Sequence, residues 1–212
     1  MALEQVIEIR RKVEKMKKIA FMTLIIFSLL ICQVYPCSKT GNEEVSSLFE
    51  QPLLITSAGQ SAEVQLASVL AKRAGLNYTL SKLATSKELT DIKTLVLVLG
   101  ASMKGLGAAG LDEEKEKERV RSLVAEAKKK NIPLLCLHLG GEVRRGQLTD
   151  EMIIEFLPFS RMAIVVKSGN KDGIFTKICQ ENNIPLVEVE KIVDTAEPLQ
   201  KIFKTGSSIA YL

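Results

Sequence analysis

The sequence predicts an α/β fold: a three-layer sandwich in which a mostly parallel sheet carries helices on both faces. After residue 51, short apolar runs of strand length alternate with longer amphipathic segments, the pattern produced by right-handed β-α-β units. The apolar runs are continuous, which indicates strands buried on both faces. We expect the strand order 2-1-3-4-5, with the last strand at the edge.

Six segments are expected to form the strands: 52–57, 77–83, 94–100, 133–139, 162–168 and 185–190. The pattern is weakest for the second of them. The intervening helices comprise one that ends at Gly75 and four that span 112–130, 150–157, 171–183 and 195–204. The helix 112–130 has the clearest signal, because acidic residues open it and three lysines close it, which suits the two ends of the helix dipole.

The chain divides into three parts: an N-terminal extension with a signal or anchor segment (1–36), a polar linker (37–51) and a single α/β domain (52–212). The chain has 212 residues and a net charge of +4. Residues 1–18 contain six Lys or Arg and three Glu, a contribution of +3, so the rest of the chain supplies only +1. This charge predicts no nucleic-acid partner.

The N-terminal extension predicts an extracytoplasmic location. Lys15, Lys17 and Lys18 precede an apolar run over residues 19–31, which is shorter than the roughly 20 residues of a spanning helix and typical of an export signal. Three forms remain open: a cleaved signal, an uncleaved membrane anchor, and a lipoprotein that starts at Cys32 or Cys37. The small residues that usually precede a lipidated cysteine are absent.

The loops that follow the strands predict a binding site. In a parallel sheet of this kind, ligands bind outside the carboxyl ends of the strands. The loops 56–61, 100–110, 138–150 and 167–173 combine glycine with polar or basic residues, whereas the opposite connections resemble plain helix stops. Exposed amides and helix N-termini favour an anionic or carboxylated ligand. The candidate ligand-binding residues are Ser57, Gly59, Ser61, Ser102, Lys104, His138, Gly140, Gly141, Arg144, Arg145, Lys167, Ser168 and Asp172, with Lys171 as a further source of charge.

Each of these features also has a structural interpretation. The turn around Gly59 is consistent with a simple helix start that Ser61 caps, and His138 with a core histidine bonded to backbone. Arg144 and Arg145 are consistent with a solvated pair for which Glu142 or Asp150 is a partner. Cys136 and Cys179 are expected to be buried thiols, and no metal site is expected, because the segment "NKDG" lacks the later ligands of a calcium loop.

The loop "TSAGQS" resembles the phosphate loop of flavodoxins, so the predicted fold is flavodoxin-like. Thr56, Ser57, Gly59 and Ser61 match the hydroxyl-rich, glycine-containing pattern of that loop, while Ala58 departs from it. Flavodoxins also hold the flavin ring between aromatic side chains, which the later loops lack. No cofactor is therefore expected, and flavin mononucleotide in particular is not.

A longer string, "HLGGEVRRGQLTDEMIIEFLP…MAIVVKSGNKDGIFTKI", is similar to a family of exported bacterial α/β proteins described as a domain of unknown function. The resemblance covers most of the chain after the linker. It implies an extracytoplasmic bacterial location and brings no activity with it. The positions that carry it are His138, Gly140, Gly141, Arg144, Arg145, Asp150, Lys167, Ser168, Asp172 and Gly173.

Two classes of function follow. The first is a non-catalytic domain that binds a small anionic ligand outside the membrane, beside a transporter or sensor. The second is a hydrolase or transferase that uses His138, the only candidate base, with Ser57, Ser102 or Ser168 as nucleophile. The chain has neither a G-x-S-x-G elbow nor an H-E-x-x-H motif, which favours binding over catalysis. A purely structural domain is a third alternative.

Overall fold

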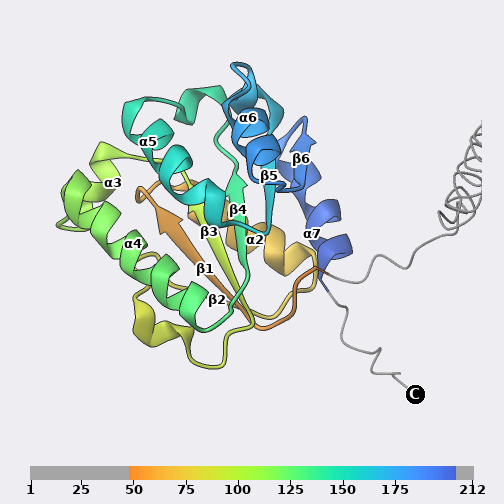
Figure 1. The fold of residues 1–212 in the computed structure, drawn as a ribbon, viewed down its shortest axis with the longest axis horizontal. Coiled ribbons are helices and arrows are strands. Elements are labelled where there is room, and N and C mark those ends of the chain that lie inside the picture. The colour runs from red at the N-terminus through yellow and green to blue at the C-terminus, as the bar shows by residue number, and fades with distance from the viewer. Residues whose placement is uncertain (1–47, 204–212) are drawn as a thin grey trace, which may run out of the picture. The chain divides into compact units, whose positions relative to one another are not determined.

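The computed structural model describes residues 48–203, which form a six-stranded, all-parallel sheet in the order β2-β1-β3-β4-β5-β6 (Figure 1). The strands are β1 (Leu53–Ala58), β2 (Tyr78–Leu80), β3 (Thr94–Leu99), β4 (Leu134–His138), β5 (Met162–Val166) and β6 (Leu186–Val189). The predicted strand order is confirmed. The predicted signal or anchor segment and most of the predicted linker lie outside the described residues.

Helices cover both faces of the sheet, which confirms the three-layer architecture. They are α2 (Glu63–Arg73), α3 (Met103–Ala108), α4 (Glu113–Lys129), α5 (Gln147–Phe156), α6 (Ile174–Glu181) and α7 (Ala196–Ile202). Apolar residues of α3, α4, α5 and α6 pack on one face of the sheet, and those of α2 and α7 pack on the other. Figure 1 shows α4 and α5 in front of the sheet and α2 behind it. Among residues 48–203, none of the helices has the length and apolar character needed to cross a bilayer.

Helix α4 shows how sequence determines these elements. Asp112 accepts a hydrogen bond from the Lys115 amide at 2.8 Å and so caps the N-terminus, as its place before a run of acids suggests. Val120, Leu123, Val124 and Ala127 form the buried stripe. Two ion pairs, Lys117 with Glu151 and Arg121 with Glu155, join α4 to the neighbouring α5.

Two segments differ from the prediction. Residues 100–110 were expected to be a loop, but Met103–Ala108 forms the short helix α3, because Ser102 accepts a hydrogen bond from the Gly105 amide and caps it. Phe49, within the predicted linker, is buried in the core, where its ring lies 5.6 Å from that of Phe203. The Phe49 amide donates to the Ile202 carbonyl at 3.1 Å, so this segment is packed against the end of α7.

The connections at the amino ends of the strands are plain helix stops, as expected. Gly75, Asn131 and Asn183 follow α2, α4 and α6 with φ values of 72°, 56° and 54°. Glycine and asparagine tolerate this left-handed conformation, which ends a helix and turns the chain into the next strand. The polar and glycine-rich loops therefore gather at the opposite edge of the sheet.

The two cysteines of the domain are expected to react slowly in the native state. Cys136 in β4 and Cys179 in α6 are both buried, and burial raises the pKa of their thiols to about 12 and about 11. In a chain that carries Cys32→Ser and Cys37→Ser, an aromatic disulfide reagent should label neither thiol until the protein unfolds. A Lys129→Cys variant, which places a thiol at an exposed position, is the positive control, and native labelling as fast as that control would contradict the packing of β4 or α6.

Candidate functional site

The loops after β1 and β3 converge at the carboxyl edge of the sheet and pack directly on each other. The Ser102 amide donates to the Gly59 carbonyl at 2.8 Å, and the Gly100 amide donates to the Ala58 carbonyl at 3.0 Å. A Cβ atom on Gly105 would lie 2.0 Å from the Gln60 carbonyl oxygen. These loops are thus held together by backbone contacts at the point where the strand order reverses.

The β1 loop holds a carboxylate that belongs to the protein itself. Glu116 of α4 is fully buried, and its Oε1 accepts hydrogen bonds from the Gly59 amide at 2.8 Å and from Gln60 Nε2 at 3.0 Å. Gly59 has a φ of 107°, and a Cβ atom there would lie 2.5 Å from the Gly100 carbonyl oxygen. Only glycine fits this position, so "TSAGQS" is built to receive Glu116.

Arg119 completes this buried ion pair. Its Nε and Nη2 donate to the two oxygens of Glu116 at 2.9 and 2.8 Å, while its Nη groups also donate to the carbonyls of Ser57 and Ala84 at 2.5 and 2.8 Å. One guanidinium therefore joins α4 to the end of β1 and to the segment before η1 (Ser86–Leu89). The Gly59 amide, which the flavodoxin-like interpretation offers to a phosphate, is already occupied.

A second group of polar residues lies beside this ion pair, and we call it the Arg144 cluster: Ser61, Glu63 and Arg144, with Gly100 and Gly140. Arg144 Nε and Nη2 each lie 2.9 Å from Glu63 Oε1. Ser61 is only 2% exposed and Glu63 only 7%, yet Ser61 Oγ and Glu63 Oε2 have no hydrogen-bond partner among the described residues. The cluster thus contains two buried oxygen atoms that can still accept hydrogen bonds.

Glycines make room for the Arg144 side chain. A Cβ atom on Gly140 would lie 2.3 Å from Arg144 Cβ, and one on Gly100 would lie 3.0 Å from Arg144 Cγ and 3.1 Å from Ser61 Oγ. Burial raises the pKa of the Glu63 carboxyl, but the Ser61 hydroxyl, which lies close to the carboxylate without the geometry of a hydrogen bond, acts with the backbone and Arg144 to outweigh burial and leave the pKa below its usual value. Glu63 is therefore ionised at neutral pH.

The predicted N-cap at Ser61 does not form. Ala62 occupies the N-cap position of α2, and its methyl side chain cannot accept a hydrogen bond from the first turn. Ser61 Oγ has no hydrogen-bond partner among the described residues. The structural interpretation of this turn is therefore wrong in that detail, although Gly59 does supply the positive φ that it requires.

His138 has the geometry of a core histidine. Its Nδ1 lies 2.9 Å from the Leu99 carbonyl oxygen and its Nε2 lies 3.1 Å from that of Gly141. The ring is fully buried, 5.1 Å from the ring of Phe175, and Gly169 is packed against it. Burial lowers the pKa of His138, so the ring is neutral at pH 7. A neutral imidazole has a single N–H, so one of the two carbonyls accepts a hydrogen bond from the ring and the other only lies against the second nitrogen. These contacts place the ring between the end of β3 and the loop that follows β4.

The chain matches the family model described as a domain of unknown function (DUF6305) over residues 50–203. It belongs to the DUF6305 family. The expected membership of a family of unknown function is confirmed, while the exported bacterial location implied with it stays a prediction.

Solved structures similar to the DUF6305 domain include two hydrolases. One is a putative lipolytic protein of the G-D-S-L family from Desulfitobacterium hafniense, with 12% identity, a TM-score of 0.31 and coverage of 64% of this chain and 75% of that one. The other is a GDSL-like lipase from Bacteroides thetaiotaomicron, with 13% identity, a TM-score of 0.31 and coverage of 64% and 66%. No match was found among curated proteins. At this similarity no residue role is transferred to the DUF6305 domain.

The candidate serines are not paired with His138. Ser57 Oγ is buried without a partner, and Ser102 Oγ accepts from the Gly105 amide. Ser168, in the turn η4 (Lys167–Asn170), packs its hydroxyl over Gly141. None of the three shares a hydrogen bond with the imidazole in the described part of the chain.

In the DUF6305 domain, Arg145 joins the loop after β4 to the loop after β5 through hydrogen bonds. It donates to Asp150 at 2.6 Å, to both oxygens of Asp172 at 2.9 and 2.8 Å and to the Gly169 carbonyl at 2.5 Å. Hydrogen bonds from Arg145 lower the pKa of Asp172 to about 2. These contacts join the turn η2 (Glu142–Arg144) to the start of α6, so Asp150 is a partner of Arg145, as the structural interpretation held.

The candidate lysines lie apart from the Arg144 cluster. Lys167 pairs with Glu190 at 2.7 Å, beyond the edge strand β6, and Lys171 pairs with Glu142. Lys104 is exposed on α3. In the described residues no group of three or more His, Cys, Asp or Glu side chains could hold a metal ion.

Glu63, Glu116 and Arg119 are not among the functional residues that the sequence predicts. Glu63 and Glu116 looked like ordinary acids in the first turns of helices, where they favour the dipole. One signal was available, because Glu116 lies four residues before Val120 and seven before Leu123. It is thus on the buried stripe of α4, where an acid requires a partner.

The buried ion pair should contribute strongly to stability. Glu116→Gln keeps the side-chain shape but leaves Arg119, whose side chain is only 11% exposed, without its counter-charge, and should lower the free energy of unfolding by about 2 to 4 kcal/mol. Glu118→Gln, on the exposed side of the same helix, should cost less than about 1 kcal/mol. Urea unfolding followed by circular dichroism measures both. Equal costs for the two variants would contradict a stabilising role for Glu116.

Proposed function

We propose that the DUF6305 domain is a non-catalytic ligand-binding domain that takes a small carboxylated solute at the Arg144 cluster. The observation that supports this is the pair of buried oxygens, Ser61 Oγ and Glu63 Oε2, that lack partners beneath an arginine seated on glycines. Buried polar atoms of a folded protein are normally satisfied. A ligand that carries hydrogen-bond donors would satisfy them.

The charges of the cluster narrow the class of ligand. Arg144 Nη1 has no acceptor among residues 48–203, so it can donate to a carboxylate. Glu63 repels a ligand that is only anionic, but its free Oε2 accepts from a hydroxyl or ammonium group. The best match is therefore a hydroxy acid or an amino acid, which carries a carboxylate and a donor on neighbouring carbons.

Entry of such a ligand requires movement of the turn that carries Arg144. The Arg144 side chain is 29% exposed and lies over the buried oxygens. The turn η2 is flanked by Gly141 and Gly146, which have φ values of 59° and 150°. Residues with little steric restriction on both sides of a short turn suit a hinge. Once the contacts of Arg145 with Asp172 and of Glu142 with Lys171 are released, the turn would swing outward and expose Ser61 and Glu63.

The hydrolase alternative has less support from the geometry. A general base needs a ring nitrogen within hydrogen-bond reach of the nucleophile, and both nitrogens of His138 face backbone carbonyls instead. A conformational change would have to free the ring before any of the candidate serines could use it. Binding without catalysis therefore remains the leading proposal.

We also propose that the domain acts outside the cytoplasmic membrane, beside a transporter or sensor. This proposal rests on the basic and apolar character of the N-terminal extension. A phosphatase that requires an oxidising compartment should be active when fused after residue 50 and inactive when fused after residue 14. Inactivity of the downstream fusion would contradict export.

The ligand proposal predicts a ranking of simple probes. Lactate, which has a carboxylate and a hydroxyl, should stabilise the full chain against heat more than acetate or ethanolamine, each of which has only one of the two groups. Arg144→Ala should weaken lactate binding about 10- to 100-fold in calorimetry, because a charged hydrogen bond contributes roughly 1.5 to 3 kcal/mol. The exposed Arg73→Ala variant is the matched control and should bind as the wild type does.

Two outcomes would contradict the proposal. The first is equal stabilisation by lactate and acetate, which would show that Glu63 and Ser61 make no contribution. The second is unchanged lactate affinity in Arg144→Ala. Since Arg144 is paired with a buried carboxylate, the variant will also be less stable, and affinity must be measured well below its unfolding temperature.

A further inference from the structure

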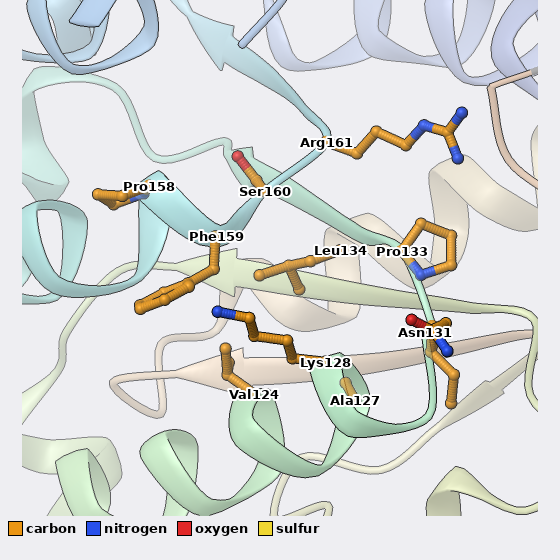
Figure 2. A pocket seen from close by; sticks show the side chains of 11 residues that line it. Val124, Ala127, Lys128, Asn131, Pro133, Leu134, Pro158, Phe159, Ser160 and Arg161 are labelled. Carbon is orange, nitrogen blue, oxygen red and sulfur yellow. The ribbon is translucent and has the colours of Figure 1, made fainter. Parts of the chain in front are cut away.

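A cavity of about 450 Å³ lies at the opposite, amino edge of the sheet (Figure 2). The end of α4 and the start of β4 form one side of it, and the junction between the turn η3 (Leu157–Phe159) and β5 forms the other. Its volume is within the range of small-molecule sites. It is remote from the Arg144 cluster, which lies at the carboxyl ends of the strands.

Phe159 is the main aromatic wall of this cavity. Phe159 is 51% exposed, which is unusual for phenylalanine. A second cavity, lined by α4 and α5 residues that include Phe156, borders the same ring. The Lys128 Nζ lies 5.6 Å from the centroid of the Phe159 ring, close enough for a cation–π contact. The Phe159 ring therefore separates the two cavities and lies next to the ammonium group of Lys128.

The charges that line the cavity are of one sign. Lys128 and Arg161 are its only charged residues, and neither is within ion-pair distance of a carboxylate in the described part of the chain. Elsewhere on α4, Lys117 and Arg121 are paired with acids of α5. Figure 2 shows the Lys128 amino group turned toward Phe159 and Arg161 extending on the other side of Leu134. An apolar floor thus lies between two cations without counter-ions.

We propose that this cavity binds a small organic carboxylate with an aromatic or aliphatic body. The body would pack on Val124, Leu134 and Phe159, and the carboxylate would accept a hydrogen bond from Lys128. The two parts of the ligand supply what the cavity lacks: apolar atoms over an exposed ring and a negative charge beside an unpaired cation. Arg161 would select longer ligands that carry a second acceptor at the far end.

The test uses 4-phenylbutyrate and its neutral counterpart 4-phenylbutan-1-ol as probes of the full chain. Binding is followed by titration calorimetry and by the chemical shifts of the Phe159 ring. The acid should bind about tenfold more tightly than the alcohol, the ratio expected for one charged hydrogen bond. Lys128→Gln should remove that difference, while the control Lys129→Gln, at the neighbouring exposed position outside the cavity lining, should retain it. Arg144→Ala should not alter binding, which distinguishes this cavity from the Arg144 cluster.

A second variant guards against indirect effects. Phe159→Ala should weaken the acid and the alcohol to the same extent, because it removes the wall that both contact. Equal affinity of acid and alcohol in the wild type would overturn the proposal, as would loss of the preference in Lys129→Gln. Failure of both probes to bind up to about 10 mM would also overturn it and leave the exposed ring as a surface for a protein partner.

Discussion

The buried pair of Glu116 and Arg119 is the contact on which the carboxyl edge of this sheet depends. A carboxylate removed from water requires a counter-charge and several donors, and here Arg119, the Gly59 amide and Gln60 provide them. The same guanidinium binds the carbonyls of Ser57 and Ala84. The position of α4, the conformation of Gly59 and the end of β1 are therefore coupled, and the place where related sheets hold a ligand is filled from within.

Because Glu116 fills the β1 loop, the polar groups that remain free to bind a ligand lie elsewhere, beside this loop and at the amino edge of the sheet. Beside Glu116, the Arg144 cluster has an ionised Glu63 with one free oxygen and an arginine that rests on two glycines. At the amino edge, Lys128 and Arg161 stand over apolar residues without acidic partners. The first arrangement suits a ligand with both donors and a carboxylate, and the second suits an apolar acid. The two differ because Glu63 supplies a negative charge that the amino-edge cavity lacks.

The layers and the strand order follow from the sequence because they rest on local patterns. Continuous apolar runs of strand length such as Leu95–Leu99 predict buried strands between helices, and Gly75 or Asn131 ends a helix through its left-handed backbone conformation. The site could not be predicted in this way, since Glu63 and Arg144 are 81 residues apart and no local pattern near either residue indicates that the two are in contact. The sequence also did not indicate what binds the β1 loop, because Glu116, which accepts the hydrogen bond from the Gly59 amide, lies in a helix 57 residues further along the chain. Short helix α3 was missed because glycines at 105 and 107 weakened its pattern.

The β1 loop is occupied by Glu116, and we propose that a carboxylate is recognised beside it, at Arg144. Amide chemical shifts of the full chain during a lactate titration test this most directly, because they report each loop separately. Saturable shifts are expected at Ser61, Gly140 and Gly141, with the Gly59 amide unchanged in its bond to Glu116. Large shifts at Gly59 and Ala101, with none at Gly140 or Gly141, would show that the ligand displaces Glu116 and would contradict recognition at Arg144.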